Sequence, residues 1–129
     1  MSYSRWRDER FWPTFRAALL ATHPGINAES LEAAREYNRL RYHYQGVGRY
    51  EPEQVYARGV ANLGAVADIL GEKPFFFAGT PENLDAAVYG FVANIYFYDI
   101  DTPLKRYVLS RPYLVRHCLA VHERVRSAG

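Results

Sequence analysis

The chain has 129 residues, of which 49% are hydrophobic and 16% are aromatic, and its formal net charge is +2. This length suits a single domain over residues 1–129 with a sizeable core, and the composition excludes a disordered chain. The one cysteine, Cys118, excludes an internal disulfide. Arginines alternate with acids along the expected helices, which is not the clustered positive charge of a nucleic-acid surface, so we expect no nucleic-acid partner.

No stretch of the sequence resembles a targeting or membrane segment. The first ten residues are rich in arginine and acids and contain no apolar region of the kind found in a signal peptide. The longest uncharged run is shorter than the roughly 20 residues that a membrane span requires. We therefore expect a cytoplasmic protein without a membrane span.

Aromatic and apolar residues recur at helical spacing from Tyr3 to about Ala21 and are interrupted by Pro13. Since proline breaks a helix interior, the pattern predicts one helix ending near Phe11 and a second starting at Pro13, or a single kinked helix. A loop follows at residues 23–25.

Two longer helices are expected next. Asn27 is a plausible N-cap for the first of them, and Gly46 ends it. The other begins at Pro52, where a missing N–H costs nothing, and stops at Gly71. Within it are Gly59 and Gly64, each of which costs roughly 1 kcal/mol against alanine, and we interpret them as points of close approach to a neighbouring helix.

Three aromatic residues, Phe75–Phe77, follow in a loop-like context. They allow either a short strand or an extended segment against the core. Because no second strand candidate exists to pair with them, we favour the extended segment.

The stretch Asp85–Tyr98 has no charge between Asp85 and Asp99 and shows no polar face at helical period. A helix that is apolar all round is buried on all sides in a globular protein. We therefore expect a central core helix.

Two helices complete the chain. Thr102 is the expected N-cap of a short helix that starts at Pro103 and ends near Ser110. The final helix starts near Pro112, and its apolar positions are Leu114, Val115, Cys118, Leu119, Val121 and Val125. The pattern thus predicts an all-α domain, an orthogonal bundle of about six helices around the helix at Asp85–Tyr98.

The order of short motifs along this chain resembles the C-terminal helical domain of glutathione transferases. It is most similar to the failed-axon-connections and metaxin-like branch of that family. The matching residues are Leu70–Phe77, Gly79, Pro81, Asp85–Ala87, Gly90–Phe91, Asp101–Leu104 and Pro112–Val115, together with Gln45–Arg49, Tyr3–Trp6 and residues 12–16.

In that family a thioredoxin-like domain comes first and holds glutathione. The resemblance covers the second domain only, since nothing before Tyr3 has room for such a unit. It implies that this chain is the substrate-side, dimer-forming half of a glutathione-transferase-like protein. We expect this chain to hold no cofactor and not to be catalytic on its own. Glutathione is implied as the cofactor of full-length relatives. The alternative is a non-enzymatic protein-interaction domain of metaxin-like type. The resemblance also implies a homodimer and allows a hydrophobic small-molecule ligand.

The start of the central helix departs from the family pattern. Where the family has a serine or threonine three residues before the aspartate, this chain has Glu82, with Asp85 retained. We expect Asp85 to be a structural carboxylate that binds N–H groups at the helix start rather than a catalytic one. Thr80 is a candidate for an earlier cap of the same helix.

Other reactive side chains give no catalytic or metal pattern. His117 and His122 are five residues apart, and His23 and His43 lie in other segments, so we expect core or free histidines and no metal site. Cys118 lies on an apolar stripe and is expected to act as a small hydrophobic residue.

Arg5, Trp6 and Trp12 are the candidates for substrate binding. In the resemblance, the first helix of this domain faces the cleft in which a hydrophobic co-substrate lies. The alternative interpretation is that these aromatic residues belong to the core.

Overall fold

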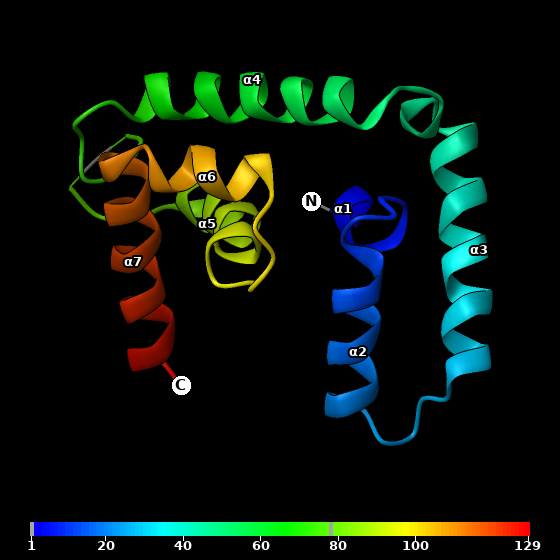
Figure 1. Cartoon of the computed structure of the whole chain (residues 1–129). Helices are drawn as coiled ribbons and strands as arrows, with labels where there is room; N and C mark the ends of the chain where they lie inside the picture. The colour runs from blue at the N-terminus through cyan, green and yellow to red at the C-terminus, as the bar shows by residue number, and fades with distance from the viewer. Residues whose placement is uncertain (1, 78) are drawn as a thin grey trace. The chain divides into compact units, whose positions relative to one another are not determined.

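The computed structural model describes residues 2–77 and 79–129. Over these residues it contains seven α-helices, one short 3-10 helix and no β-strand, so the predicted all-α class is confirmed (Figure 1). The chain divides into two compact units, Met1–Val55 and Tyr56–Gly129, which are described in turn. A single domain over the whole chain stays a prediction.

The first unit begins with two short helices, α1 (Ser2–Trp6) and α2 (Trp12–Thr22). The alternative with two helices is therefore right, but the first helix ends at Trp6 and not near Phe11. Asp8 accounts for the earlier end, because its Oδ1 atom accepts the backbone N–H of Arg10 at 3.0 Å and closes a turn.

Helix α3 (Ala28–Tyr44) follows, and it runs antiparallel to α2 in Figure 1. The side chain of Asn27 accepts the N–H of Ser30 at 2.8 Å, so the predicted N-cap is confirmed. Gly46, with φ of 90°, ends the helix as predicted. A 3-10 helix (Val47–Arg49) then leads to α4.

Helix α4 (Pro52–Leu70) starts and stops where the sequence predicts, and its residues from Tyr56 onward belong to the second unit. A Cβ atom on Gly59 would lie 2.7 Å from Cδ2 of Leu104, and one on Gly64 would lie 3.1 Å from the hydroxyl of Tyr107. The two glycines thus make room for side chains of α6, which confirms the interpretation of close approach.

The remaining helices are α5 (Asn83–Tyr96), α6 (Pro103–Leu109) and α7 (Pro112–Ser127), and α5 packs against both others. Thr102 accepts the N–H of Lys105 at 3.2 Å, which confirms it as the N-cap of α6. In the segment between α4 and α5, Phe75 and Phe76 are buried without forming a strand, as the extended-segment interpretation predicts.

The prediction that the central helix is buried on all sides is wrong within the second unit. Val92 and Ile95 of α5 are buried, but the side chains of Phe91 and Phe97 are 65% and 48% exposed. The reason is that α6 and α7 cover one side of α5, whereas the sequence pattern reports polarity and not the number of neighbouring helices.

The apolar stripe predicted for α7 also needs correction. Its buried residues are Leu114, His117, Cys118 and Val121. Leu119 and Val125, which the sequence assigns to the same stripe, are 39% and 55% exposed. The core face of α7 is therefore narrower than predicted and includes a histidine.

Candidate functional site

Three aromatic rings gather in the first unit where α1 meets α2. The ring centroid of Trp6 lies 5.7 Å from that of Trp12 and 5.0 Å from that of Phe15, the latter in an edge-to-face arrangement. Trp12 and Phe15 are buried, while Trp6 is half-buried. We call these three residues the tryptophan cluster.

Arg35 of α3 completes the cluster from the neighbouring helix. Its guanidinium carbon lies 4.7 Å from the ring centroid of Trp12, and its Nε donates to the backbone oxygen of Trp6 at 3.4 Å. Its Nη2 also forms an ion pair with Glu9 at 2.7 Å. The result is a largely buried aromatic cluster with a cation over one ring, an arrangement that stabilises aromatic packing.

Two of the three sequence candidates therefore come together. Trp6 and Trp12 share the cluster, and Arg5 is half-buried in α1 next to Trp6 in the sequence. Sequence reasoning missed Arg35, which it treated only as part of a charged helix face. No local signal identifies that residue, because its partners Trp6 and Trp12 lie more than 20 residues away in the chain.

A buried polar network lies at the start of α5 in the second unit. Asp85 accepts three hydrogen bonds: from the N–H of Glu82 at 2.9 Å, from the N–H of Phe76 at 3.1 Å, and from Nε2 of His117 at 2.8 Å. Both Asp85 and His117 are 0% exposed. Asp85 thus joins the segment before α5, the start of α5 and α7.

The structure locates the start of α5 and corrects the proposed cap. Glu82 is the N-cap residue and Asn83 the first helical residue, so Thr80 lies outside the helix and does not cap it. Asp85, in the first turn, accepts the N–H of the N-cap residue. A carboxylate here also complements the positive end of the helix dipole.

The pKa of Asp85 is lowered from its ordinary value. Burial by itself raises that pKa, because the charged form loses water. The hydrogen bonds from Glu82, His117 and Phe76, which favour the charged form, outweigh this effect. Asp85 and His117 have no exposed surface, so this pair lies within the core of the second unit.

His117 is a core histidine, which is one of the two alternatives that the sequence predicts. Sequence reasoning missed its partners, since its Nε2 pairs with Asp85 and its ring meets the rings of Phe75 and Phe76 edge-on. The position of His117 between Leu114 and Cys118, on the apolar face of the last helix, could have indicated that this histidine has a buried partner. A polar side chain there requires a buried partner.

Cys118 is fully buried beside His117, as the sequence predicts for a small hydrophobic residue. Burial raises the pKa of its thiol to about 11. Because the thiolate is the reactive form, this side chain is not a nucleophile at neutral pH.

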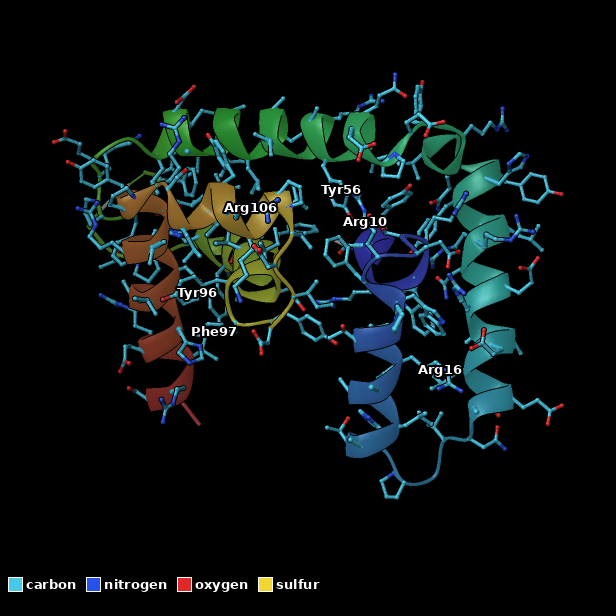
Figure 2. All side chains as sticks on the ribbon, viewed as in Figure 1. Arg10, Arg16, Tyr56, Tyr96, Phe97 and Arg106 are labelled. Carbon is cyan, nitrogen blue, oxygen red and sulfur yellow. The ribbon has the colours of Figure 1, made fainter. Side chains whose placement is uncertain are left out.

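An apolar groove of about 650 Å³ lies on the surface of the second unit, where the end of α5 and the end of α6 meet α7. Figure 2 labels Tyr96, which lines the groove, and Phe97 beside it at the end of α5. The other lining residues are Leu109, Pro112, Val115, Arg116, Leu119, Ala120 and Glu123. We call this feature the α7 groove.

Two kinds of feature are absent from the described part of the chain. Among residues 2–77 and 79–129, no three His, Cys, Asp or Glu side chains gather so as to hold a metal ion. None of the helices in these same ranges combines the length and the apolarity needed to cross a bilayer.

A large part of the second unit is similar to a known protein family. Residues 59–121 match the family described as "Glutathione S-transferase, C-terminal domain". The resemblance read from the sequence motifs is therefore confirmed for these residues, which include most of α4 and all of α5 and α6.

Two curated proteins are similar to the chain. "Failed axon connections" of Drosophila melanogaster is 29% identical over 82 residues, which cover 61% of this chain and 19% of that protein. "Isoprene-epoxide--glutathione S-transferase" of Rhodococcus sp. (strain AD45) is 28% identical over 119 residues, which cover 87% of this chain and 48% of that protein. The chain thus spans about half the length of the second relative and about a fifth of the first. No solved structure matches it.

Proposed function

We propose that this chain is the helical, hydrophobic-substrate-side domain of a glutathione S-transferase-like protein. The observation that carries the proposal is the match of residues 59–121 to the C-terminal domain of that family. It is supported by a similar protein whose name describes the transfer of glutathione to isoprene epoxide. The homodimer implied by the resemblance and the cytoplasmic location expected from the sequence are part of the proposal.

In this proposal, catalysis requires a second, glutathione-binding domain. Activating the glutathione thiol takes hydrogen-bond donors or positive charge held close to its sulfur. The polar pair Asp85 and His117 is enclosed in the core, where no substrate meets it. The chain's own contribution is an apolar contact for the electrophilic co-substrate. We assign that contact to Trp6, the half-exposed ring of the otherwise buried tryptophan cluster, and to its sequence neighbour Arg5.

Two assays on the isolated chain test the proposal. Calorimetric titration with glutathione is expected to show no saturable binding, and a chromogenic aryl halide is expected to react with glutathione at the buffer rate. The apolar dye anilinonaphthalene sulfonate is expected to bind. Trp6→Ala should weaken that binding roughly fivefold, because an aromatic contact contributes about 1 kcal/mol.

Tyr37→Ala is the matched control for Trp6→Ala, since Tyr37 is a 68% exposed aromatic residue of the same unit. It should leave dye binding unchanged. Saturable glutathione binding, or turnover by the chain alone, would overturn the proposal that catalysis requires a second, glutathione-binding domain. Equal loss of dye binding in both variants would overturn the assignment to Trp6.

A second candidate function is the non-enzymatic interaction domain. It is favoured by the exposed apolar face of α5, on which Leu84 and Phe91 are 38% and 65% exposed, and by the similarity to "Failed axon connections". One experiment separates the two candidates. Joining the chain behind the glutathione-binding part of the bacterial relative should give conjugating activity in the first case and none in the second.

A further inference from the structure

A second pocket of the second unit lies between the end of α4 and the junction of α6 with α7 (Figure 1). Its volume is about 380 Å³, which is at the small end of the range of roughly 300–1,000 Å³ that is typical of ligand pockets. The end of α4 lines it with Asp68, Gly71 and Glu72, and the junction lines it with Arg111, Pro112 and Tyr113. We call this feature the junction pocket.

The junction pocket has a negative wall and a positive wall. Asp68 in the last turn of α4 and Glu72 just after that helix contribute two carboxylates, and Arg111 contributes the cation. Within residues 2–77 and 79–129, neither carboxylate forms an ion pair with Arg111 or with another cation. Opposite charges that line one pocket without closing an ion pair leave space between them for a ligand that carries both complementary charges.

The cation of the positive wall is held in place by Tyr107 of α6. Nε of Arg111 donates to the Tyr107 hydroxyl at 3.0 Å, and the guanidinium carbon lies 5.0 Å from the centroid of the same ring. Tyr107 in turn packs against α4 at Gly64, where an added Cβ would lie 3.1 Å from its hydroxyl. These contacts use Nε alone, so the N–H groups of Nη1 and Nη2 are left for an anion. A planar guanidinium binds a carboxylate well through two parallel hydrogen bonds.

The negative wall is tied to α7. Gly71 has φ of 55° and ends α4, so the chain turns at the edge of the pocket. Nη2 of Arg116 donates to the backbone oxygens of Glu72 and Lys73, each at 2.8 Å, and so fixes the segment after α4 against α7. The helix dipoles reinforce the side-chain charges, because the negative end of α4 lies beside the carboxylates and the positive end of α7 lies beside Arg111.

We propose that the junction pocket binds a small zwitterion, namely a free α-amino acid with an apolar side chain. The ligand's carboxylate pairs with Arg111, and its ammonium group pairs with Asp68 and Glu72. Its apolar side chain lies against Pro112 and the 43% exposed ring of Tyr113. This inference makes no use of the proposed glutathione chemistry. Glutathione has a negative net charge and is disfavoured by the two carboxylates of the pocket.

The exposure of the charges sets the expected strength. Asp68, Glu72 and Arg111 are all exposed, and charge pairs at exposed positions are weak. We therefore expect a dissociation constant on the order of 1 mM for the probe L-phenylalanine. Titration of the full nitrogen-15-labelled chain, followed by the NMR shifts of its backbone amides, measures constants in this range and also locates the site. The largest shifts are expected at the end of α4 and the start of α7.

Two analogues of L-phenylalanine test whether both charges of the ligand are recognised. The first, 2-phenylethylamine, keeps the ammonium group and lacks the carboxylate. The second, 3-phenylpropanoate, keeps the carboxylate and lacks the ammonium group. Each analogue should bind roughly threefold more weakly than L-phenylalanine, because each loses one charge pair at an exposed position.

Two substitutions then assign the charges to the walls of the pocket. Arg111→Gln should weaken the binding of L-phenylalanine and 3-phenylpropanoate roughly threefold and should not weaken that of 2-phenylethylamine. Asp68→Asn should weaken the binding of L-phenylalanine and 2-phenylethylamine and should not weaken that of 3-phenylpropanoate. Since general damage to the fold would weaken all three ligands alike, this crossed pattern reports recognition of charge.

Arg58→Gln is the matched control for Arg111→Gln, because Arg58 is an exposed arginine of α4 that does not line the junction pocket. It should bind all three ligands like the wild type. The proposal is overturned if L-phenylalanine causes no saturable shift up to about 10 mM, or if the shifts lie away from the end of α4 and the start of α7. It is also overturned if the analogues bind as tightly as L-phenylalanine, or if neither substitution distinguishes between them.

Discussion

Replacing Asp85 with alanine should destabilise the second unit by about 2–6 kcal/mol. The substitution removes the acceptor of three hydrogen bonds at 2.8, 2.9 and 3.1 Å. The N–H of Phe76 and the Nε2 of His117 are left in the core without water, at about 1–3 kcal/mol each. Glu82 is exposed, so its N–H regains a water molecule and adds little.

Asp85→Asn should cost less, about 2 kcal/mol, since the amide oxygen still accepts while the amide nitrogen faces a donor. These losses are a large fraction of the 5–15 kcal/mol that a domain of this size possesses.

Urea denaturation followed by far-ultraviolet circular dichroism measures both variants. The control is Asp68→Ala, which removes an exposed aspartate from α4 and should stay within about 0.5 kcal/mol of the wild type. If Asp85→Ala loses less than about 1 kcal/mol, the network around Asp85 does not stabilise the fold and the structural role assigned here is wrong.

Three further predictions concern acid, glycine and the thiol. The pKa of Asp85 is lowered on folding, so the charged carboxylate contributes its full stabilisation above about pH 5. That contribution is lost as the pH falls through the unfolded pKa of about 3.9 toward the lower folded pKa. The difference in unfolding free energy between the wild type and Asp85→Asn should therefore shrink between about pH 5 and pH 3 in urea titrations. Gly90→Ala should stabilise the second unit by about 0.5–1 kcal/mol, because an added Cβ at Gly90 meets nothing within 4 Å. Gly59→Ala should destabilise it, because its Cβ would lie 2.7 Å from Leu104. Equal thermal midpoints for the two variants would contradict the packing of α4 on α6. Cys118 is buried and its pKa is raised to about 11, so it should react with an aromatic disulfide reagent only as fast as the second unit opens. Asp85→Ala should therefore accelerate the reaction. Fast labelling of the folded wild type would contradict the burial of Cys118.

Features set by neighbouring residues were predictable from the sequence. The caps at Asn27 and Thr102 and the helix end at Gly46 depend on side chains within three or four positions of the helix terminus, and all three are confirmed. The close approach at Gly59 was also readable, because glycine in a helix interior has a cost that packing must offset.

Features set by distant residues were not predictable in the same way. The partners Asp85 and His117 are 32 residues apart, and no periodicity links them. The contact of Arg35 with Trp12 likewise depends on how α2 and α3 meet. The exposure of Phe91 depends on which helices cover α5, which a sequence pattern does not report.

The position of the tryptophans gives each half of the molecule its own spectroscopic signal. Trp6 and Trp12 both belong to the first unit, whereas the sole thiol, Cys118, belongs to the second. Indole emission during a thermal scan therefore follows the ordering around α1 and α2. Thiol accessibility in the same scan follows the ordering around α7. Helix α4 runs without a break through the boundary at Val55 and Tyr56. Comparing the midpoints of the emission curve and the thiol-accessibility curve therefore measures whether the two units, which share this helix, unfold together or separately.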